Sequence, residues 1–257
     1  MNVKAKKHLG QHFLTDEDIA KKIVESLDFQ LYQYVLEVGP GTGVLTKYLL
    51  EKPTETYVAE IDTESIEYLK LHFQKLENKH FTGDFLKINL SDIFSGEVAV
   101  IGNFPYNISS QILFKIIENY QQIPEMVGMF QKEVAERTAA VPRTKDYGIL
   151  SVLVQAYYDV KYLFTVHENV FNPPPKVKSG VIKLTRNRKE GLEGNEILFK
   201  QIVKTGFGQR RKKLSNALKS LDIPEVLKSH AFMDKRAEEL SVEDFINFTK
   251  EWKAAKN

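Results

Sequence analysis

Apolar segments alternate with stretches of helical periodicity along the first two thirds of the chain. The segments that predict strands lie at residues 35–38, 57–59, 79–82 and 98–101. The stretches that predict helices lie at residues 16–27, 44–50, 64–76, 109–120 and 148–157. Because this β-α alternation continues to about residue 184, it predicts an α/β fold with a doubly wound, Rossmann-like sheet.

The pattern changes in the last third of the chain. Residues 186–195 are charged and contain glycine, as is typical of a linker. Residues 196–252 are helical in pattern, with a break near Pro224 and a new start after Ser241. We therefore expect two domains, residues 1–187 with the sheet and residues 188–257 as a small all-helical domain.

Composition narrows the class of protein. With 257 residues, 42% of them hydrophobic, the chain can bury a sizeable core in one large and one smaller domain. It has no cysteine, which excludes disulfides, thiolate catalysis and thiolate-held metal. No run approaches the roughly 18 apolar residues of a membrane span, and the basic start lacks a signal-type apolar stretch. We expect a soluble, cytoplasmic protein.

Charge is distributed unevenly, although the net charge is only +2. Residues 198–221 hold seven Lys or Arg and no acidic residue. Such a stretch is suited to RNA phosphates, and we predict that Arg210, Arg211 and Lys212 contact RNA. The alternative is a solvated helix face, which is the usual explanation of a charge run.

The tetrapeptide Asn103-Phe104-Pro105-Tyr106 follows directly on the strand predicted at residues 98–101. Ligands of open α/β sheets bind at the carboxyl ends of strands. An amino group on adenine or cytosine is a weak nucleophile, because its lone pair is delocalised into the ring. The Asn103 side-chain oxygen and a backbone carbonyl beside Pro105 could each accept one amino hydrogen, and Tyr106 could stack on the base. The alternative is an ordinary strand-ending turn.

Upstream residues are suited to a nucleoside cofactor. The glycine-rich turn at residues 39–43 lets backbone approach a ligand, and Pro40 argues against a nucleoside triphosphate site. Glu60 stands about twenty positions further on, where an acid can accept ribose hydroxyls, although a surface carboxylate is the alternative. Asp84 ends the next β unit. NAD and S-adenosylmethionine both fit these features, but only a methyl donor accounts for the tetrapeptide.

Seven blocks, spread over nearly the whole chain, are together characteristic of one known family. They are residues 9–14, 37–43, 60–62, 103–109, 131–134, 171–177 and 207–212. With these blocks the chain resembles the ribosomal RNA small-subunit adenine dimethyltransferases. The resemblance implies methyl transfer from S-adenosylmethionine to the amino groups of two adjacent adenosines near the 3′ end of small-subunit (16S) rRNA. It also implies a pre-30S particle as partner, and we expect a monomer that needs no metal.

The resemblance assigns roles to individual residues. His12 and Leu14 close over the methionine end of the cofactor, Glu60 holds the ribose, and Asp84 meets the adenine amino group. The implied cofactor contacts are His12, Leu14, Gly39, Gly41, Glu60, Ile61, Asp84, Phe85 and Asn103. The implied catalytic residues are Asn103, Phe104, Pro105 and Tyr106, and Phe171 packs on the target base opposite Tyr106.

Two residues depart from the family pattern, and three other functions remain open. His12 stands where the family often has Asn, and Phe104 where it often has Leu. The alternatives are a large-subunit rRNA adenine methyltransferase of the antibiotic-resistance type, a non-catalytic ribosome-assembly factor, and a small-molecule or DNA amino methyltransferase. The three prolines at residues 173–175 and the Gln209-Arg210-Arg211-Lys212 block favour the small-subunit enzyme.

Overall fold

The computed structural model describes residues 3–256, which form two compact units. Unit 1 comprises the described residues up to 135 together with Asp159–Arg186, and unit 2 comprises Glu136–Tyr158 together with the residues from 187 on. The division after residue 186 lies next to the domain boundary that we predict at 187/188, which stays a prediction. Residues 136–158 group with the C-terminal residues, which no local pattern in the sequence indicated.

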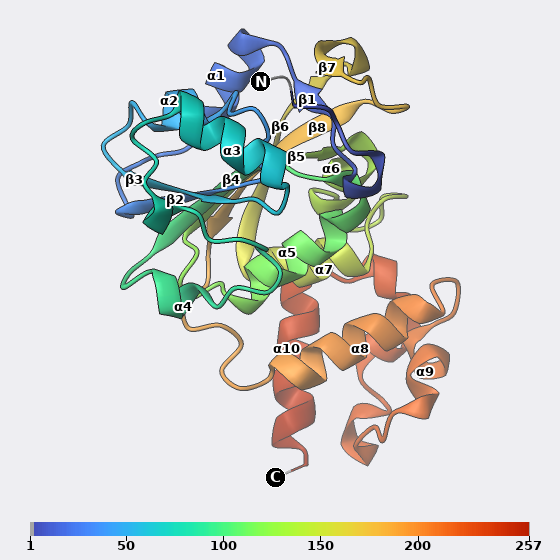
Figure 1. Ribbon diagram of the computed structural model, residues 1–257. Helices are drawn as coiled ribbons and strands as arrows, with labels where there is room; N and C mark the ends of the chain where they lie inside the picture. Colours follow the sequence, from blue (N-terminus) through green and yellow to red (C-terminus); the bar gives the residue numbers. More distant parts are fainter. Residues whose placement is uncertain (1–2, 257) are drawn as a thin grey trace. The chain divides into compact units, whose positions relative to one another are not determined.

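Unit 1 is built around one sheet (Figure 1). Its strands are β2 (Tyr34–Val38), β3 (Glu55–Ala59), β4 (Val98–Asn103), β5 (Glu125–Gln131), β6 (Tyr158–Val166) and β8 (Ser179–Arg186), in the order β3-β2-β4-β5-β8-β6. The pairs β2·β3, β2·β4 and β4·β5 are parallel, and β8 runs antiparallel to β5. The order reverses at β2, and this confirms the predicted doubly wound α/β fold.

Helices cover both faces of the sheet. They are α1 (Glu17–Val24), α2 (Thr46–Leu49), α3 (Thr63–His72), α4 (Leu90–Ile93), α5 (Ser109–Glu118) and α6 (Lys132–Thr138). Figure 1 shows α1, α2 and α3 above the strands and α4 and α5 below them. On the first face Ile23 and Leu49 pack with strand residues such as Val35 and Ile101, all fully buried. Burial of this kind stabilises the fold by about 25 cal/mol per Å² of apolar surface.

The prediction of a strand at residues 79–82 is wrong, because these residues do not form a strand of the sheet. Residues Asn78–His80 form a single 3-10 turn, and Phe81 makes only an isolated bridge to Val58. The His80 ring accepts a hydrogen bond from the Glu77 backbone N–H and packs edge-on against Tyr57. These contacts of the His80 side chain hold the segment in a turn, so it does not form a seventh strand of the sheet.

Phe104, directly after β4, fills a space that two glycines leave open. Gly102 and Gly128 lie opposite each other on β4 and β5. A Cβ atom at Gly128 would stand 2.1 Å from the Phe104 ring. The ring is 1% exposed and packs against Phe130 at 4.8 Å between centroids. Its side chain therefore belongs to the core, and only its backbone is available to a ligand.

Unit 2 consists of helices and 3-10 turns joined by loops, and it also holds the end of α6 and the first residue of β6. Its helices are α7 (Ile149–Gln155), α8 (Glu196–Gly208), α9 (Leu214–Ala217) and α10 (Val242–Ala254). Ser241 caps α10 by accepting from Asp244 N–H, as the sequence predicts. Phe207, Phe245, Phe248 and Trp252 form the aromatic core between α8 and α10. Across residues 3–256, no helix has both the length and the apolar character needed to cross a membrane.

Candidate active site

A cavity in unit 1 lies where β2, β3 and β4 end. Its wall is formed by the loops after these three strands, by the loop around Asp84 and by the N-terminal segment at residues 8–13. The residues that the sequence assigns to the cofactor or to catalysis and that line it are His12, Gly39, Gly41, Glu60, Ile61, Asp84, Phe85, Asn103, Phe104, Pro105 and Tyr106. The parallel strands bring these residues together because their carboxyl ends share one edge of the sheet.

The glycine turn after β2 closes the floor of this cavity. Gly39 and Gly41 have φ angles of 69° and 55°, which residues with a side chain seldom adopt. At Gly41 a Cβ atom would also stand 2.7 Å from the Phe13 ring. The turn can therefore present bare backbone to a ligand, and at Gly41 no larger residue fits.

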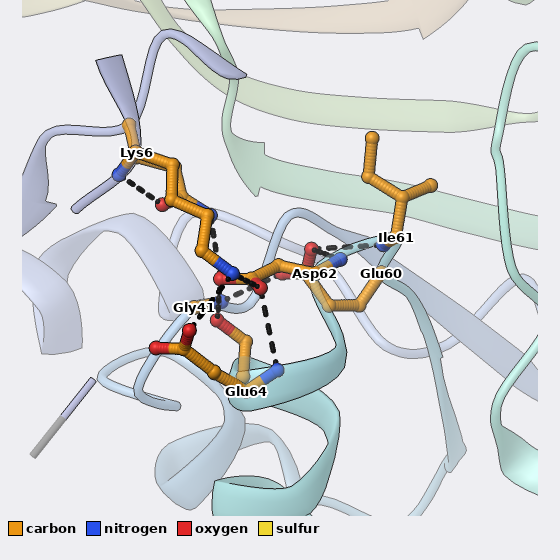
Figure 2. Close-up of polar contacts among 8 residues, drawn as sticks. Lys6, Gly41, Glu60, Ile61, Asp62 and Glu64 are labelled. Atoms are coloured by element: carbon orange, nitrogen blue, oxygen red, sulfur yellow. Dashed lines mark hydrogen bonds and ion pairs between the residues drawn. The ribbon is translucent and has the colours of Figure 1, made fainter. Parts of the chain in front are cut away.

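Glu60 is buried at the end of β3 and accepts three backbone hydrogen bonds. They come from Gly41 N–H at 3.2 Å, Ile61 N–H at 2.8 Å and Asp62 N–H at 2.9 Å (Figure 2). Burial raises the pKa of Glu60, and these three donors oppose that rise. A carboxylate has about four acceptor positions, so Glu60 can still accept a hydrogen bond from a ligand hydroxyl.

Ile61 presents an apolar side chain to the cavity. The residue is 55% exposed, and in Figure 2 its side chain points away from the hydrogen-bonded cluster around Glu60. An exposed β-branched side chain next to a carboxylate at a cavity wall offers a flat, planar ligand an apolar contact.

The N-terminal segment is held to this wall through Asp62, which the sequence analysis did not single out. Lys6 forms an ion pair with the buried Asp62 carboxylate and lies 3.2 Å from a Glu64 oxygen (Figure 2). Gln11 bridges the same region, because its amide donates to Asp62 and its oxygen accepts from the Lys6 backbone N–H. Sequence separation of more than 50 residues concealed this contact.

The Asp62 carboxylate is stabilised in its charged form. Burial alone would raise the pKa of Asp62, but hydrogen bonds from Lys6, Gln11 and Ser65 outweigh burial and hold the pKa below its ordinary value. The charged Asp62 carboxylate therefore pairs with Lys6 and fixes the N-terminal segment to the loop after β3.

Asp84 and Phe85 form the opposite side of the cavity. One Asp84 oxygen accepts from the Leu86 backbone N–H at 3.0 Å, and the other lies 3.4 Å from the exposed Lys87 ammonium group. Phe85 is 3% exposed and anchors the loop in the core. The Asp84 carboxylate keeps acceptor capacity toward a ligand amino group.

Asn103 is the last residue of β4, and its amide group has a defined orientation. Its Nδ2 donates to the His12 backbone oxygen at 2.8 Å. Among the described residues no donor reaches Oδ1, which remains the acceptor available to a ligand. The following residue is fixed as well, because Phe104 N–H donates to the Met129 carbonyl at 3.1 Å. The acceptors at this point of the cavity are therefore preorganised.

Tyr106 stands next to these acceptors and is held by a residue that the sequence analysis missed. Its hydroxyl lies 2.5 Å from the hydroxyl of Ser179, a fully buried residue at the start of β8. The His12 ring stacks on Tyr106 with 5.5 Å between centroids and 29° between planes. Because a carbonyl can only accept, His12 donates from Nδ1 to the Pro173 oxygen at 2.8 Å.

Glu37 lies beneath the glycine turn and has a perturbed carboxyl group. Burial raises the pKa of Glu37 to about 8, although Thr46 donates a hydrogen bond of 2.6 Å to it, and the nearby Glu60 charge adds to the rise. Together with Leu14 and Asn103, Glu37 lines a smaller hollow next to the main cavity. Its neighbour Thr46 begins α2, so the carboxyl also ties the turn to that helix.

Some predicted site residues lie outside the main cavity. Leu14 and Phe171 pair across the short strands β1 (Phe13–Leu14) and β7 (Phe171–Asn172) and are 3% and 4% exposed. Phe171 packs in the core of unit 1 and does not line the cavity. Arg210, Arg211 and Lys212 belong to unit 2. Within residues 3–256, no cluster of three or more His, Asp or Glu side chains is arranged to bind a metal.

Known proteins resemble this chain over nearly its full length. A model of the family described as ribosomal RNA adenine dimethylase matches residues 2–254. The Ribosomal RNA small subunit methyltransferase A of Flavobacterium johnsoniae is 58% identical over 253 residues, which cover 98% of this chain and 97% of that protein. The protein of the same name from Cytophaga hutchinsonii is 57% identical over 249 residues, 96% of each chain.

Solved structures show the same likeness. A dimethyladenosine transferase from Plasmodium falciparum has a TM-score of 0.83 and 26% identity, covering 95% of this chain and 98% of that one. The 23S rRNA methyltransferase ErmE has a TM-score of 0.69 and 24% identity, covering 94% and 99%, and shows the fold alone. From the match across residues 2–254 and the relatives at 57% and 58% identity, this protein belongs to the ribosomal RNA adenine dimethylase family.

Proposed function

We propose that this enzyme transfers methyl groups from S-adenosylmethionine to the amino groups of two adjacent adenosines near the 3′ end of small-subunit rRNA, giving dimethyladenosine. The single observation that carries the proposal is the Asn103 amide. Its nitrogen is engaged by His12, and its oxygen is free at the end of β4, within the cavity that Glu60 and Asp84 also line. The names of the small-subunit relatives support the choice of substrate.

The cavity fits a nucleoside cofactor by its own chemistry. Glu60 offers acceptors for ribose hydroxyls, Asp84 offers an acceptor for a ring amino group, and Ile61 offers an apolar surface for the ring. The Gly39–Gly41 turn lets the methionine end of the cofactor approach the backbone closely. When bound, S-adenosylmethionine supplies an electrophilic methyl group on a sulfonium centre.

The residues at the end of β4 activate the target amine. The Asn103 side-chain oxygen and the Phe104 backbone carbonyl each accept one amino hydrogen, which localises the nitrogen lone pair toward the methyl donor. Pro105 fixes the backbone that follows, and Tyr106 supports the extruded base by stacking. The methylated amine carries a positive charge and loses its proton to water, so no general base of the chain is needed.

Ser179 should matter to this reaction through Tyr106. We expect Ser179→Ala to slow methyl transfer about fivefold, because loss of a net ~1 kcal/mol hydrogen bond frees the Tyr106 ring. Tyr106→Phe should lose the same bond, so the double variant should be no slower than either single variant. Single-turnover kinetics would measure this, with the exposed Ser91→Ala as control. Additive losses would contradict the coupling.

The substrate surface belongs to unit 2 in this proposal. The basic stretch around Arg211 and Lys212, both exposed, contacts rRNA phosphates of a pre-30S particle. We further propose that the enzyme acts as a cytoplasmic monomer. Large-subunit methylation is less well supported, because relatives at 51% to 58% identity, such as those from Flavobacterium johnsoniae and Porphyromonas gingivalis, carry the small-subunit name.

Labelled methyl transfer to purified ribosomal subunits tests the proposal. The substrates are small and large subunits from cells that lack the corresponding modification. We expect label on the small subunit alone, recovered as dimethyladenosine by mass spectrometry. Label on the large subunit would support the resistance-type function, binding without transfer would support a non-catalytic assembly factor, and transfer only to free nucleosides or DNA would overturn the rRNA assignment.

A further inference from the structure

A loop of unit 2 is held in an unfavourable backbone conformation. Arg143, within residues 141–146, has a φ angle of 68°, in the left-handed region that residues other than glycine seldom adopt. Its backbone N–H donates to the Glu238 carbonyl at 2.8 Å, and the Tyr147 hydroxyl donates to the Leu240 carbonyl at 2.9 Å. Such a conformation persists only where surrounding contacts hold it.

The guanidinium group of Arg210 makes two further contacts around this loop. Its Nε donates to the Glu238 carboxylate at 2.6 Å, and its Nη2 donates to the Thr144 carbonyl at 3.1 Å. The side chain is 39% exposed and that of Glu238 is 28% exposed, so the pair is partly sheltered from solvent. One planar group therefore joins the 141–146 loop to the 3-10 turn Ala237–Glu239.

The neighbouring arginines are placed differently. A hollow in unit 2 is lined by Arg143, Arg211, Lys213, Asp234, Arg236, Glu238 and Glu239. Lys213 is paired with Asp234 at 3.0 Å. Arg143, Arg211 and Arg236 are exposed, and among the contacts of residues 3–256 none of these three side chains is in an ion pair. Three arginines are thus available to an anion, whereas Arg210 is engaged within the protein.

We propose that Arg210 is a positioning residue, which together with Glu238 holds the 141–146 loop so that Arg143 lines the hollow and meets RNA phosphates. The inference rests on the proposed function, in which the substrate is rRNA. It divides the Arg210-Arg211-Lys212 block by role: Arg211 and Lys212 contact RNA directly, and Arg210 acts through Arg143.

Two conservative variants give different results for positioning and for direct contact. Glu238→Gln keeps the shape of the side chain but weakens its bond to Arg210. If Arg210 is a positioning residue, RNA affinity falls about threefold to tenfold. If Arg210 contacts phosphate, removal of the acid frees it for one more phosphate, so the salt dependence steepens by about 0.7–0.9 log units. Arg210→Lys keeps the charge but loses the two-pronged geometry; if Arg210 is a positioning residue, Arg143→Ala should cost little more affinity in this background.

The RNA affinities of double variants distinguish positioning of Arg143 by Arg210 from a general loss of structure. Once Arg210→Ala has released the loop, Arg143→Ala should cost little more RNA affinity. The two changes together should reduce the slope of log affinity against log salt concentration by about 0.7–0.9, the value of one phosphate contact. Arg211→Ala should instead add its full effect to Arg210→Ala. Lys228→Ala, which removes an exposed charge of unit 2 outside residues 198–221, is the matched control.

Binding should be measured with unmethylated small subunits and with a generic RNA hairpin, together with thermal unfolding of each variant. A salt dependence steeper by one phosphate contact for Glu238→Gln, unchanged binding by Arg210→Lys, or additivity of Arg210→Ala with Arg143→Ala would each overturn the inference alone. Wild-type enzyme that binds neither RNA would overturn the proposed function, and the inference with it.

Discussion

Asn103→Ala is expected to slow methyl transfer on the order of a hundredfold or more, because it removes a preorganised acceptor at the reacting amine. The structure adds a second consequence. Loss of the Nδ2 bond to the His12 carbonyl also loosens the N-terminal wall of the cavity, so cofactor affinity should fall modestly. Single-turnover transfer to small subunits and calorimetric titration with S-adenosylmethionine would separate the two effects.

The exposed Asn89→Ala, in the loop before α4, is the matched control and should behave as wild type. Asn103→Asp separates the two bonds further. It keeps an acceptor oxygen but places a negative charge against the His12 carbonyl, so its loss of cofactor affinity should exceed that of Asn103→Ala. Near-normal turnover by Asn103→Ala would remove Asn103 from the catalytic mechanism.

Glu60→Ala is expected to weaken S-adenosylmethionine binding by roughly 1–3 kcal/mol, through loss of charge-assisted hydrogen bonds to the ribose. The three backbone N–H groups that donate hydrogen bonds to Glu60 would also lose their acceptor, so the free enzyme should unfold at a lower temperature. Titration calorimetry measures the first effect and thermal unfolding without cofactor measures the second.

Glu60→Gln distinguishes ligand binding from support of the turn. Its remaining oxygen can accept some of the backbone bonds, so stability should recover in part while cofactor affinity stays low. Glu67→Ala, an exposed acid on the neighbouring helix α3, should leave both quantities unchanged. Wild-type cofactor affinity in Glu60→Ala would assign this carboxylate to the architecture of the glycine turn alone.

Local patterns predicted the strands β2, β3 and β4 and several helices of unit 1, but no residue range was predicted for β5, β6 or β8. Strands such as β2 and β4 are mainly apolar and buried, with Glu37 as the charged exception in β2, and helices such as α1 and α5 carry a clear apolar stripe. Period and length were therefore sufficient to identify them. The strand prediction at residues 79–82 was wrong because four residues are too few to show a reliable hydrophobic period. The conformation of these residues is decided by side-chain contacts of His80.

The residues that hold the site in place were harder to predict than the residues that form it. Asn103, Glu60 and Gly39 follow strands, and parallel strands necessarily bring their ends to one edge of a sheet. Ser179 has no such signal, and the role of Asp62 does not follow from its place after the same strand as Glu60. Their partners Tyr106 and Lys6 lie 73 and 56 residues away in the sequence.

The sequence by itself determined the fold class, the cavity at the strand ends and the family, because these depend on periodicity, on strand-end positions and on short motifs. Only the tertiary structure decided which side chains are engaged by others. Phe104 lies in the core because Gly128 leaves space for it, and Arg210 is bound to Glu238 although it stands in a basic run. Both outcomes depend on neighbours distant in sequence, which no local pattern encodes.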